Sequence, residues 1–353
     1  MATQSFLSDN ASPAHPAVLQ ALSDASRDHV ISYGDDDETV AAVEAFQELF
    51  QQECGVYFAY NGTGANVAAL RSMLRPWHGV ICTEVSHINE DEGGAPEALG
   101  GFKLLPVATP DGLLQAAHLA PFRQRHGFVH TSQPAVISIT QSNEVGCVYH
   151  REHLLELTAA AREAGYLVHM DGARIANAAA TVAHATGVSP REAMAHVCAG
   201  VDVLSFGATK NGLLFGEAVV FLRPAGERLP AEDEFPFARK QTTQLHSKMR
   251  YIAVQFSRYL QGDLWFENAF HANLMAQKLA QGLQEVPGVT LSRPVEANGV
   301  FPVLPAAVIE PLQQEFPFYL WEADRNVVRL VTSWDTEESL VEAFISRCRE
   351  LCR

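Results

Sequence analysis

Short β-rich runs alternate with longer amphipathic stretches over the first two thirds of the chain, and this alternation restricts the folds open to it. The β-rich runs are bounded by Gly, Pro or polar residues and lie at Val56–Tyr60, Val80–Thr83, Leu104–Val107, Ala135–Thr140, Tyr166–Met170, Val201–Phe206 and Ala218–Leu222. Stretches with helical periodicity lie between them, at Ala65–Leu74, Leu113–Arg125 and His153–Ala164. Such alternation builds a mostly parallel sheet covered by helices on both faces. The sequence therefore predicts an α/β fold that binds ligands beyond the carboxyl ends of its strands.

The pattern changes near residue 225, where Pro224–Phe237 is rich in proline and acidic residues. Beyond it, the spacing predicts one long helix over Arg239–Arg258 and another over Ala269–Leu283. Further predicted elements are short strands and a last helix from Glu337, the strands at Val289–Leu291, Phe301–Leu304, Phe318–Trp321 and Val327–Thr332. We expect a large α/β domain over residues 1–245 and a smaller α+β domain over 246–353, with a boundary anywhere between 225 and 265.

Composition excludes several classes of partner. The chain has 353 residues, with 41 acidic and 25 basic side chains and a net charge of −16. Nucleic acids and anionic membranes need clustered Lys and Arg, so neither is expected as a partner. No apolar run approaches the ~20 residues of a membrane helix, and residues 1–10 have no secretory pattern. Six scattered cysteines without a Cys-x-x-Cys pair indicate reduced thiols, a cytoplasmic protein and no metal site.

Three segments at predicted strand ends carry candidate chemistry. The first, Tyr60–Asn66, places Gly62, Thr63 and Gly64 at the start of a helix. Free backbone N–H groups and the helix dipole suit a single phosphate there. The P-loop and Gly-x-Gly-x-x-Gly patterns of nucleotide sites are absent. An ordinary capped turn is the alternative interpretation.

The second and third segments supply a carboxylate and an amine. Asp171 follows a strand, where it either faces the crevice or caps a helix and pairs with Arg174. Lys210 is one of only five lysines and follows a strand among small residues, as a Schiff-base enzyme requires. Lys240, next to Arg239, is a further candidate for binding an anion. A phosphate site, a strand-end Asp and a strand-end Lys together are the parts that hold pyridoxal 5′-phosphate.

With these parts the chain resembles the fold-type-I pyridoxal-phosphate enzymes, which have the aspartate aminotransferase-like fold. Within them it is similar to the low-specificity L-threonine aldolases, a group that includes phenylserine aldolases. The matching segments cover nearly the whole chain and are Leu7–Asn10, Tyr33–Asp36, Asn61–Asn66, Ser86–Ile88, Asp171–Arg174, Gly207–Gly212, Arg239–Lys240, Lys248–Arg250 and Val328–Thr332. The resemblance implies retro-aldol cleavage of a β-hydroxy-α-amino acid, such as L-threonine, L-allo-threonine or phenylserine, to glycine and an aldehyde.

The resemblance also implies roles for single residues. Lys210 would form the Schiff base, Asp171 would pair with the pyridinium nitrogen, and His87 would lie over the cofactor ring near the substrate hydroxyl. Gly62, Thr63 and Gly64 would bind the phosphate. Contacts to the substrate carboxylate would come from Ser8, Arg174 and Arg329, with Arg174 also near the cofactor. Tyr33, and Lys240 or Arg250 as cofactor contacts, would reach a site shared between subunits of a homo-oligomer.

Some alternatives stay open. Many members of the family carry a second histidine after the strand at 135–140, whereas this chain has Glu144 there. His87 is the candidate base for the β-hydroxyl proton, directly or through a water molecule, but it could also be a turn histidine held by its acidic neighbours. Another pyridoxal-phosphate lyase activity (β-elimination or cysteine desulfuration) and a non-catalytic protein that binds ligands on the same scaffold are the competing functions.

Overall fold

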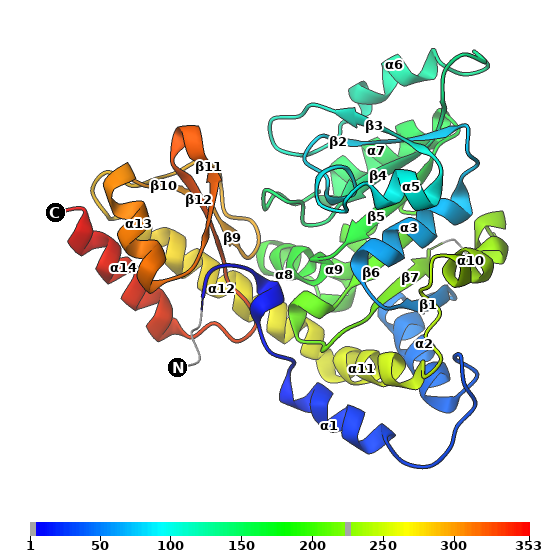
Figure 1. Ribbon diagram of the computed structural model, residues 1–353, viewed down its shortest axis with the longest axis horizontal. Coiled ribbons are helices and arrows are strands. Elements are labelled where there is room, and N and C mark those ends of the chain that lie inside the picture. Colours follow the sequence, from blue (N-terminus) through cyan, green and yellow to red (C-terminus); the bar gives the residue numbers. More distant parts are fainter. Residues whose placement is uncertain (1–4, 223–226) are drawn as a thin grey trace.

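The computed structural model describes residues 5–222 and 227–353 and contains two sheets, each covered by helices (Figure 1). The larger sheet has seven strands in the order β1-β7-β6-β5-β4-β2-β3. Its strands are β1 (Gly55–Ala59), β2 (His78–Thr83), β3 (Lys103–Val107), β4 (Gln133–Thr140), β5 (Leu167–Gly172), β6 (Val203–Gly207) and β7 (Glu217–Phe221). β2, β3, β4, β5 and β6 are parallel to one another, and β7 is antiparallel to β1 and to β6. The predicted strands and the mostly parallel α/β sheet are thus confirmed, with small shifts at the strand ends.

Helices cover both faces of this sheet. They are α1 (Pro16–Ala25), α2 (Asp37–Phe50), α3 (Gly62–Met73), α4 (His87–Glu90), α5 (Ala95–Gly100), α6 (Ala120–Arg123), α7 (Arg151–Glu163), α8 (Ile175–Thr186), α9 (Pro190–Val197), α10 (Pro230–Gln241) and α11 (Arg250–Leu260). α3, α5 and α10 pack on one face, and α2, α7, α8, α9 and α11 on the other.

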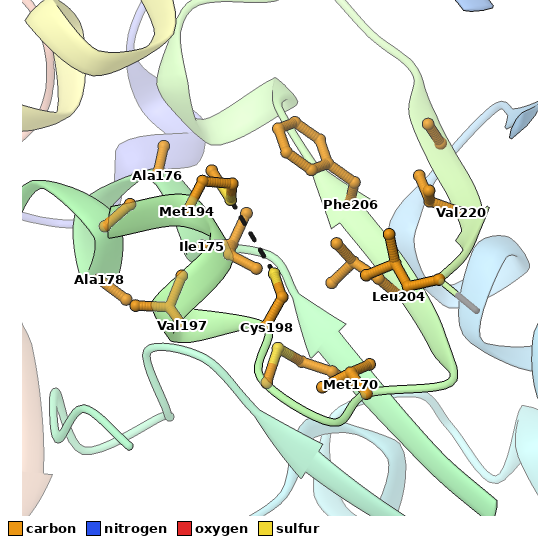
Figure 2. Packing of buried hydrophobic residues seen from close by; sticks show 14 of the residues in the cluster. Met170, Ile175, Ala176, Ala178, Met194, Val197, Cys198, Leu204, Phe206 and Val220 are labelled. Atoms are coloured by element: carbon orange, nitrogen blue, oxygen red, sulfur yellow. Dashed lines mark hydrogen bonds between the residues drawn. The ribbon is translucent and has the colours of Figure 1, made fainter. Parts of the chain in front are cut away.

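The strands supply both faces because successive side chains point to opposite sides of a sheet. Val203 belongs to the cluster under α3 and α10, whereas its neighbour Leu204 belongs to the cluster under α8 and α9. Figure 2 shows the second cluster, where Phe206 and Val220 lie beside Leu204 and face Met194 of α9. Phe206 is fully buried. This hydrophobic cluster fixes the ends of β5 and β6, and the candidate site lies at those ends.

The smaller sheet has five strands and lies against a second set of helices. Its order is β11-β12-β10-β8, with β9 paired to β12. The elements are β8 (Thr290–Leu291), β9 (Gly299–Val300), β10 (Pro302–Val303), β11 (Tyr319–Glu322), β12 (Val327–Val331), α12 (Leu264–Gln284), α13 (Ala306–Glu315) and α14 (Glu338–Leu351). The N-terminal segment joins this part, because Phe6 exchanges backbone hydrogen bonds with Pro317 and Val331 and packs in its core.

Helix α12 connects the two parts. Its first residues, including Trp265, belong to the core of the large sheet, and its later residues, including Leu279, belong to the core of the small one. α11 packs on α1 and α2, and its Phe256 lies in the large core. A boundary after residue 245 stays a prediction, and by packing α11 lies with the large sheet.

The prediction of one long helix over Arg239–Arg258 is wrong. α10 ends at Gln241 and α11 begins at Arg250. The chain turns at Thr243, which has a φ of 63°. Gln244 then points back and accepts the N–H of Tyr60 at 2.9 Å. Helical periodicity does not reveal this break, because its cause is a contact with a distant loop.

The helix predicted over Leu113–Arg125 is also wrong. Only a 3-10 turn, Ala116–Leu119, and the short helix α6 form there. Pro121 has no N–H to donate, so a continuous helix would lose a hydrogen bond at that residue. The acidic segment predicted from Pro224 begins outside the described residues and continues into α10. Among the described helices, none has both the length and the apolar character needed to span a membrane.

Candidate active site

Two adjoining cavities open at the carboxyl ends of β4, β5 and β6. The larger, of about 310 Å³, is lined by Asp171 and by the start of α3, and we call it the Asp171 cavity. The smaller, of about 220 Å³, is lined by Arg329 of β12, and we call it the Arg329 cavity. Five residues line both cavities and mark their junction: Asn10, His87, Glu144, Arg174 and Lys210. The position agrees with the rule that open α/β sheets bind ligands beyond their strand ends.

The start of α3 forms an anion-binding turn. Asn61 caps the helix, and its Oδ1 accepts the N–H of Gly64 at 2.8 Å. A Cβ at Gly64 would overlap the side-chain amide of Gln244, so only glycine fits beside that contact. Gly62 has open space where a Cβ would be, and Gly62 and Thr63 line the Asp171 cavity. First-turn N–H groups have no partner within a helix, so those of Gly62 and Thr63 are available to an anion. The N–H of Gly64 is taken by Asn61 and Gly64 does not line the cavity, and the phosphate role of this turn stays a prediction.

Asp171 lies near the end of β5 and is almost fully buried. Its Oδ1 accepts the N–H of Ala173 at 2.9 Å, and its Oδ2 accepts the side-chain N–H of Asn66 at 2.7 Å. Arg174 does not pair with it, which removes the capping ion pair considered from the sequence. A carboxylate held by two donors in a cavity can accept a further N–H, such as that of a pyridinium ring.

His87 is part of a buried hydrogen-bond network. Its Nδ1 lies 2.9 Å from Oε1 of Glu92, whose side chain is fully buried. The side-chain amide of Asn66 donates to the same Glu92 oxygen at 2.9 Å and to Asp171. The hydrogen bond to Glu92 raises the pKa of His87. The network therefore fixes the ring and favours its protonated form.

The network also explains a compact group of metal-type ligands. One atom each of His87, Glu92 and Asp171 lies within 4.8 Å of the others. Asn66 donates hydrogen bonds to both carboxylates, which accounts for their close approach without an ion. The sequence-based prediction of no metal site stays a prediction.

Lys210 lies on the 3-10 turn that follows β6. Asn211 anchors this turn by donating to the hydroxyl of Tyr259 at 2.6 Å and to the carbonyl of Trp265 at 2.8 Å. Burial and the charge of Arg174 lower the pKa of Lys210. Glu217, which also lines the Asp171 cavity, has its pKa raised to about 7 by burial. An amine with a lowered pKa gains the neutral form that attacks a carbonyl.

Arg174 is held by a buried carboxylate. Its Nε and Nη2 donate to the two oxygens of Asp9 at 2.7 and 2.8 Å. Asn298 donates to Asp9 as well, at 3.0 Å. Asp9 follows Ser8, which lines the Arg329 cavity and caps the turn that begins at Asp9. The N-terminal segment thus brings Ser8 and Arg174 to the same cavity.

Arg329 completes the basic side of that cavity. Its guanidinium lies over the rings of Tyr319, at 5.1 Å, and Trp321, at 4.8 Å. Its Nε is buried and has no hydrogen-bond partner among the described residues. Burial and the nearby charge of Arg174 lower the pKa of Arg329. A carboxylate between the two arginines would satisfy the free N–H and neutralise the facing charges.

Tyr33 and Lys240 lie in a different cavity, of about 440 Å³. The Lys240 amine sits 5.3 Å from the centre of the Tyr33 ring. Tyr60 and Asn61 line both this cavity and the Asp171 cavity, so the two lie on either side of the same loop. Within one chain, neither Tyr33 nor Lys240 lines the cavities that contain Lys210.

Arg250 is also not brought to Lys210. Its Nη1 donates to the carbonyl oxygens of Arg27 and Asp28 at 3.1 and 3.2 Å, and its guanidinium lies against Tyr251. The cofactor role predicted for Arg250 stays a prediction, as does that for Lys240.

Sequence reasoning gave no role to several residues of the site. In the sequence, Asn66 is one residue of a matching segment, Glu92 is an acidic neighbour of His87, and no pattern points to Glu217. The sequence holds one signal for Glu92, because it follows His87 by five residues across a short helix. The bond of Asn66 to Asp171 has no such signal, since 105 residues separate the two.

Comparison with known proteins shows which family the chain is similar to. Residues 5–306 match the family described as beta-eliminating lyase. The chain is 42% identical to the low specificity L-threonine aldolase of Pseudomonas aeruginosa, covering 99% of this chain and 96% of that one. It is 40% identical to that of a Pseudomonas species, covering 98% and 97%. Two solved structures are also similar. A threonine aldolase of Leishmania major has a TM-score of 0.91 and 30% identity over 99% of both chains. An aspartate aminotransferase of Thermus thermophilus has a TM-score of 0.67 and 17% identity over 99% and 97%.

Proposed function

Because the chain belongs to the beta-eliminating lyase family, we propose that it is a pyridoxal-phosphate-dependent low-specificity L-threonine aldolase. It cleaves L-threonine, L-allo-threonine and related β-hydroxy-α-amino acids to glycine and an aldehyde. The observation that carries this proposal is the placement of Lys210, Asp171 and the start of α3 around one cavity next to paired arginines. The fold is the fold-type-I arrangement predicted from the sequence.

The residues of the Asp171 cavity fit pyridoxal phosphate. Gly62 and Thr63 offer N–H groups to the phosphate, Asp171 offers an oxygen to the ring nitrogen, and Lys210 offers its amine to the aldehyde. When bound, the cofactor would accept electrons from the α-carbon of the substrate. Asn66 keeps the Asp171 carboxylate in place by donating to Oδ2.

The Arg329 cavity orients the amino acid. Arg329 and Arg174 supply a positive field, and Ser8 adds a hydroxyl for the carboxylate. Two-pronged binding by arginine restricts rotation and so aligns the Cα–Cβ bond for cleavage. Asp9 acts through Arg174, because its hydrogen bonds with Nε and Nη2 fix the orientation of the guanidinium group.

Cleavage also requires a group that takes the proton of the β-hydroxyl. Two titratable side chains at the junction, His87 and Glu144, lie close enough to line both cavities and are candidates. Glu92 fixes the His87 ring through Nδ1, so Nε2 is the atom with which His87 can meet substrate or cofactor.

The test is aldehyde release from both diastereomers of threonine and of phenylserine. Release of acetaldehyde and benzaldehyde together with glycine supports the proposal, and the rates rank the substrates. Pyruvate or sulfide release from serine or cysteine, without aldehyde, would favour β-elimination or desulfuration instead. A protein that binds the cofactor but turns over none of these would be a non-catalytic binder.

The role of Lys210 has its own test. In the wild type, borohydride reduction should fix the cofactor on the peptide that contains Lys210. Lys210→Ala should lose this labelling, whereas Lys103→Ala, which removes an exposed lysine, should keep it. A reducible adduct at the same peptide in Lys210→Ala would contradict the assignment.

We also propose that the site is completed in a homo-oligomer. The supporting observation is the cavity of Tyr33 and Lys240, which adjoins the Asp171 cavity through Tyr60 and Asn61. Mixing Tyr33→Ala subunits with Lys210→Ala subunits would restore activity if each site takes Tyr33 from one chain and Lys210 from another. A cytoplasmic location is part of the proposal, supported by six cysteines that are all unpaired in the structure.

A further inference from the structure

Glu144 lies at the junction of the two cavities, on the loop that follows β4. Its Oε1 accepts the backbone N–H of His87 at 2.7 Å and the hydroxyl of Thr140 at 3.0 Å. Its Oε2 is buried and has no hydrogen-bond partner among the described residues. An unsatisfied oxygen on a buried carboxylate is costly, because the group has lost water and gained nothing in return. The contacts of Oε1 therefore fix the carboxyl group and leave one oxygen for another molecule.

The surroundings of Glu144 disfavour its charged form. Burial, together with the negative charge of Asp171, raises the pKa of the Glu144 carboxyl. The backbone N–H of Glu144 itself, the backbone N–H of His87 and the Thr140 hydroxyl act in the opposite direction. A carboxylate whose pKa is raised above 4.5 is a stronger base than an ordinary one.

His87 is less suited to accept a proton. Its Nδ1 is engaged with Glu92, and this hydrogen bond raises the pKa of the ring. A protonated imidazole has no free lone pair, so it can donate a hydrogen bond but cannot take a proton. At the junction, the His87 ring is thus already engaged through Nδ1, whereas Glu144 keeps Oε2 free for another molecule.

We propose that Glu144 is the base that accepts the β-hydroxyl proton during cleavage, with His87 as a neighbouring donor. The inference rests on the proposed aldolase function. The Glu144 carboxylate takes the hydroxyl proton, the O–H electrons form the carbonyl bond, and the Cα–Cβ bond breaks with its electron pair left on Cα. The aldehyde departs, Cα takes a proton from solvent to give glycine, and the Glu144 carboxyl returns its proton to solvent.

The deciding variant is Glu144→Gln in the holoenzyme. The amide oxygen of Gln can still accept from His87 and Thr140, so the loop and the start of α4 keep their contacts. Only the ability to take a proton is lost. We expect kcat for L-threonine and L-allo-threonine to fall by roughly 10²–10⁴-fold, the usual contribution of a general base. KM should change little, because the carboxylate site at Arg329 and Arg174 is intact.

Two readouts separate this role from a structural one. Glycine should bind to Glu144→Gln with the same affinity as to the wild type, measured through the change in cofactor absorbance. Exchange of a glycine Cα hydrogen with deuterium from solvent, followed by NMR, should also continue, because glycine has no β-hydroxyl. The matched control is Glu296→Gln, since Glu296 also accepts a backbone N–H, that of Val148 at 2.8 Å, but lines neither cavity. It should retain wild-type kcat.

The pH profile provides an independent check. In the wild type, kcat should rise as pH increases through the pKa of Glu144, because the charged form is the base. This limb should be absent from the residual activity of Glu144→Gln. The other charged or titratable groups that interact with Glu144 are still present in the variant, so a limb that arose from one of them would persist, at most shifted in pH: His87, Asp171, Arg174, Tyr149 and Cys82.

Each outcome decides between explanations. Glu144→Gln with kcat within about threefold of wild type would overturn the assignment, and so would an equal loss of glycine hydrogen exchange, which would indicate a structural defect. If His87→Gln alone removed the pH limb while Glu144→Gln kept it, His87 would be the base. If the wild type released no aldehyde, the proposed function would fail and this inference with it, whereas an active wild type isolates the inference.

Discussion

Asp9 carries a buried charge, and the effect of its removal on the free energy of unfolding can be worked out from its contacts. The side chain is 1% exposed and forms two hydrogen bonds with Arg174 and one with Asn298. Removing one partner of a buried ion pair costs about 3–5 kcal/mol, because the other charge is left without compensation. Arg174 lines both cavities and keeps 18% of its side chain exposed, so water can partly replace Asp9. We therefore expect Asp9→Ala to lower the free energy of unfolding by about 3 kcal/mol.

The assay is urea unfolding of the holoenzyme followed by far-UV circular dichroism, at fixed protein and cofactor concentrations. The control is Asp24→Ala, which breaks the exposed pair with Arg27 and should cost less than about 1 kcal/mol. If Asp9→Ala costs no more than the control, the ion pair does not hold the N-terminal segment and the argument is refuted.

The pair of Asp9 and Arg174 also predicts that the free energy of unfolding decreases at low pH. Burial acts to raise the pKa of Asp9, but the charges of Arg174 and Lys210 outweigh it and hold the pKa below its usual value. Stability from this group is then fully present above the unfolded pKa of about 4 and is lost as pH falls through the folded pKa. The difference in unfolding free energy between wild type and Asp9→Asn should therefore shrink below about pH 4.

Three other substitutions test the local structure. Gly64→Ala should weaken binding of pyridoxal phosphate, measured by absorbance titration, because the new methyl group displaces Gln244; unchanged affinity would show that the turn tolerates a side chain. Burial lowers the pKa of His169 to about 4, so the folded state resists its protonation and stability falls with pH below 6.5. His169→Gln should flatten that fall in urea unfolding between pH 7 and 4, and an unchanged slope would assign it to other groups. Thr243→Gly should stabilise by up to about 1 kcal/mol in the same assay, because φ is 63° there, and a loss would indicate that the threonine side chain matters more than its backbone strain.

The sheet and the covalent part of the site were predictable because both depend on local pattern. β5 and β6 appear as apolar runs, and Asp171 and Lys210 lie at or just beyond the carboxyl ends of those runs. The topology of a parallel sheet then brings both side chains to one edge without further information. The turn at Gly62 follows β1 for the same reason, although β1 itself is antiparallel to its neighbour.

The hydrogen-bond partners were not predictable, because they come from elements whose approach depends on the whole fold. Asn66 on α3 meets Asp171 on β5, and Asp9 of the N-terminal segment meets Arg174 across 165 residues. The break between α10 and α11 has the same origin, since Gln244 leaves the helical path to contact Tyr60. Periodicity indicates which face of an element is buried, but it does not indicate which polar group of another element bonds to that face.

The two carboxylates around His87 differ in the kind of donor they face rather than in how fully they are bonded, because each has two contacts on Oε1 and a buried Oε2 without a partner among the described residues. Oε1 of Glu92 accepts the Asn66 amide and lies 2.9 Å from Nδ1 of His87, a contact that raises the pKa of the His87 ring. Glu144 faces neutral donors, which are its own backbone N–H, the backbone N–H of His87 and the Thr140 hydroxyl. A charge that faces a cation is stabilised, whereas a buried charge held by neutral donors gains most by taking a proton. The surroundings of Glu144 therefore raise its pKa, and the contact with Glu92 raises the pKa of His87. Asn66 donates to Glu92 and Thr140 donates to Glu144. Replacing these donors should shift the pH limb of kcat, although both carboxylates and His87 remain in place.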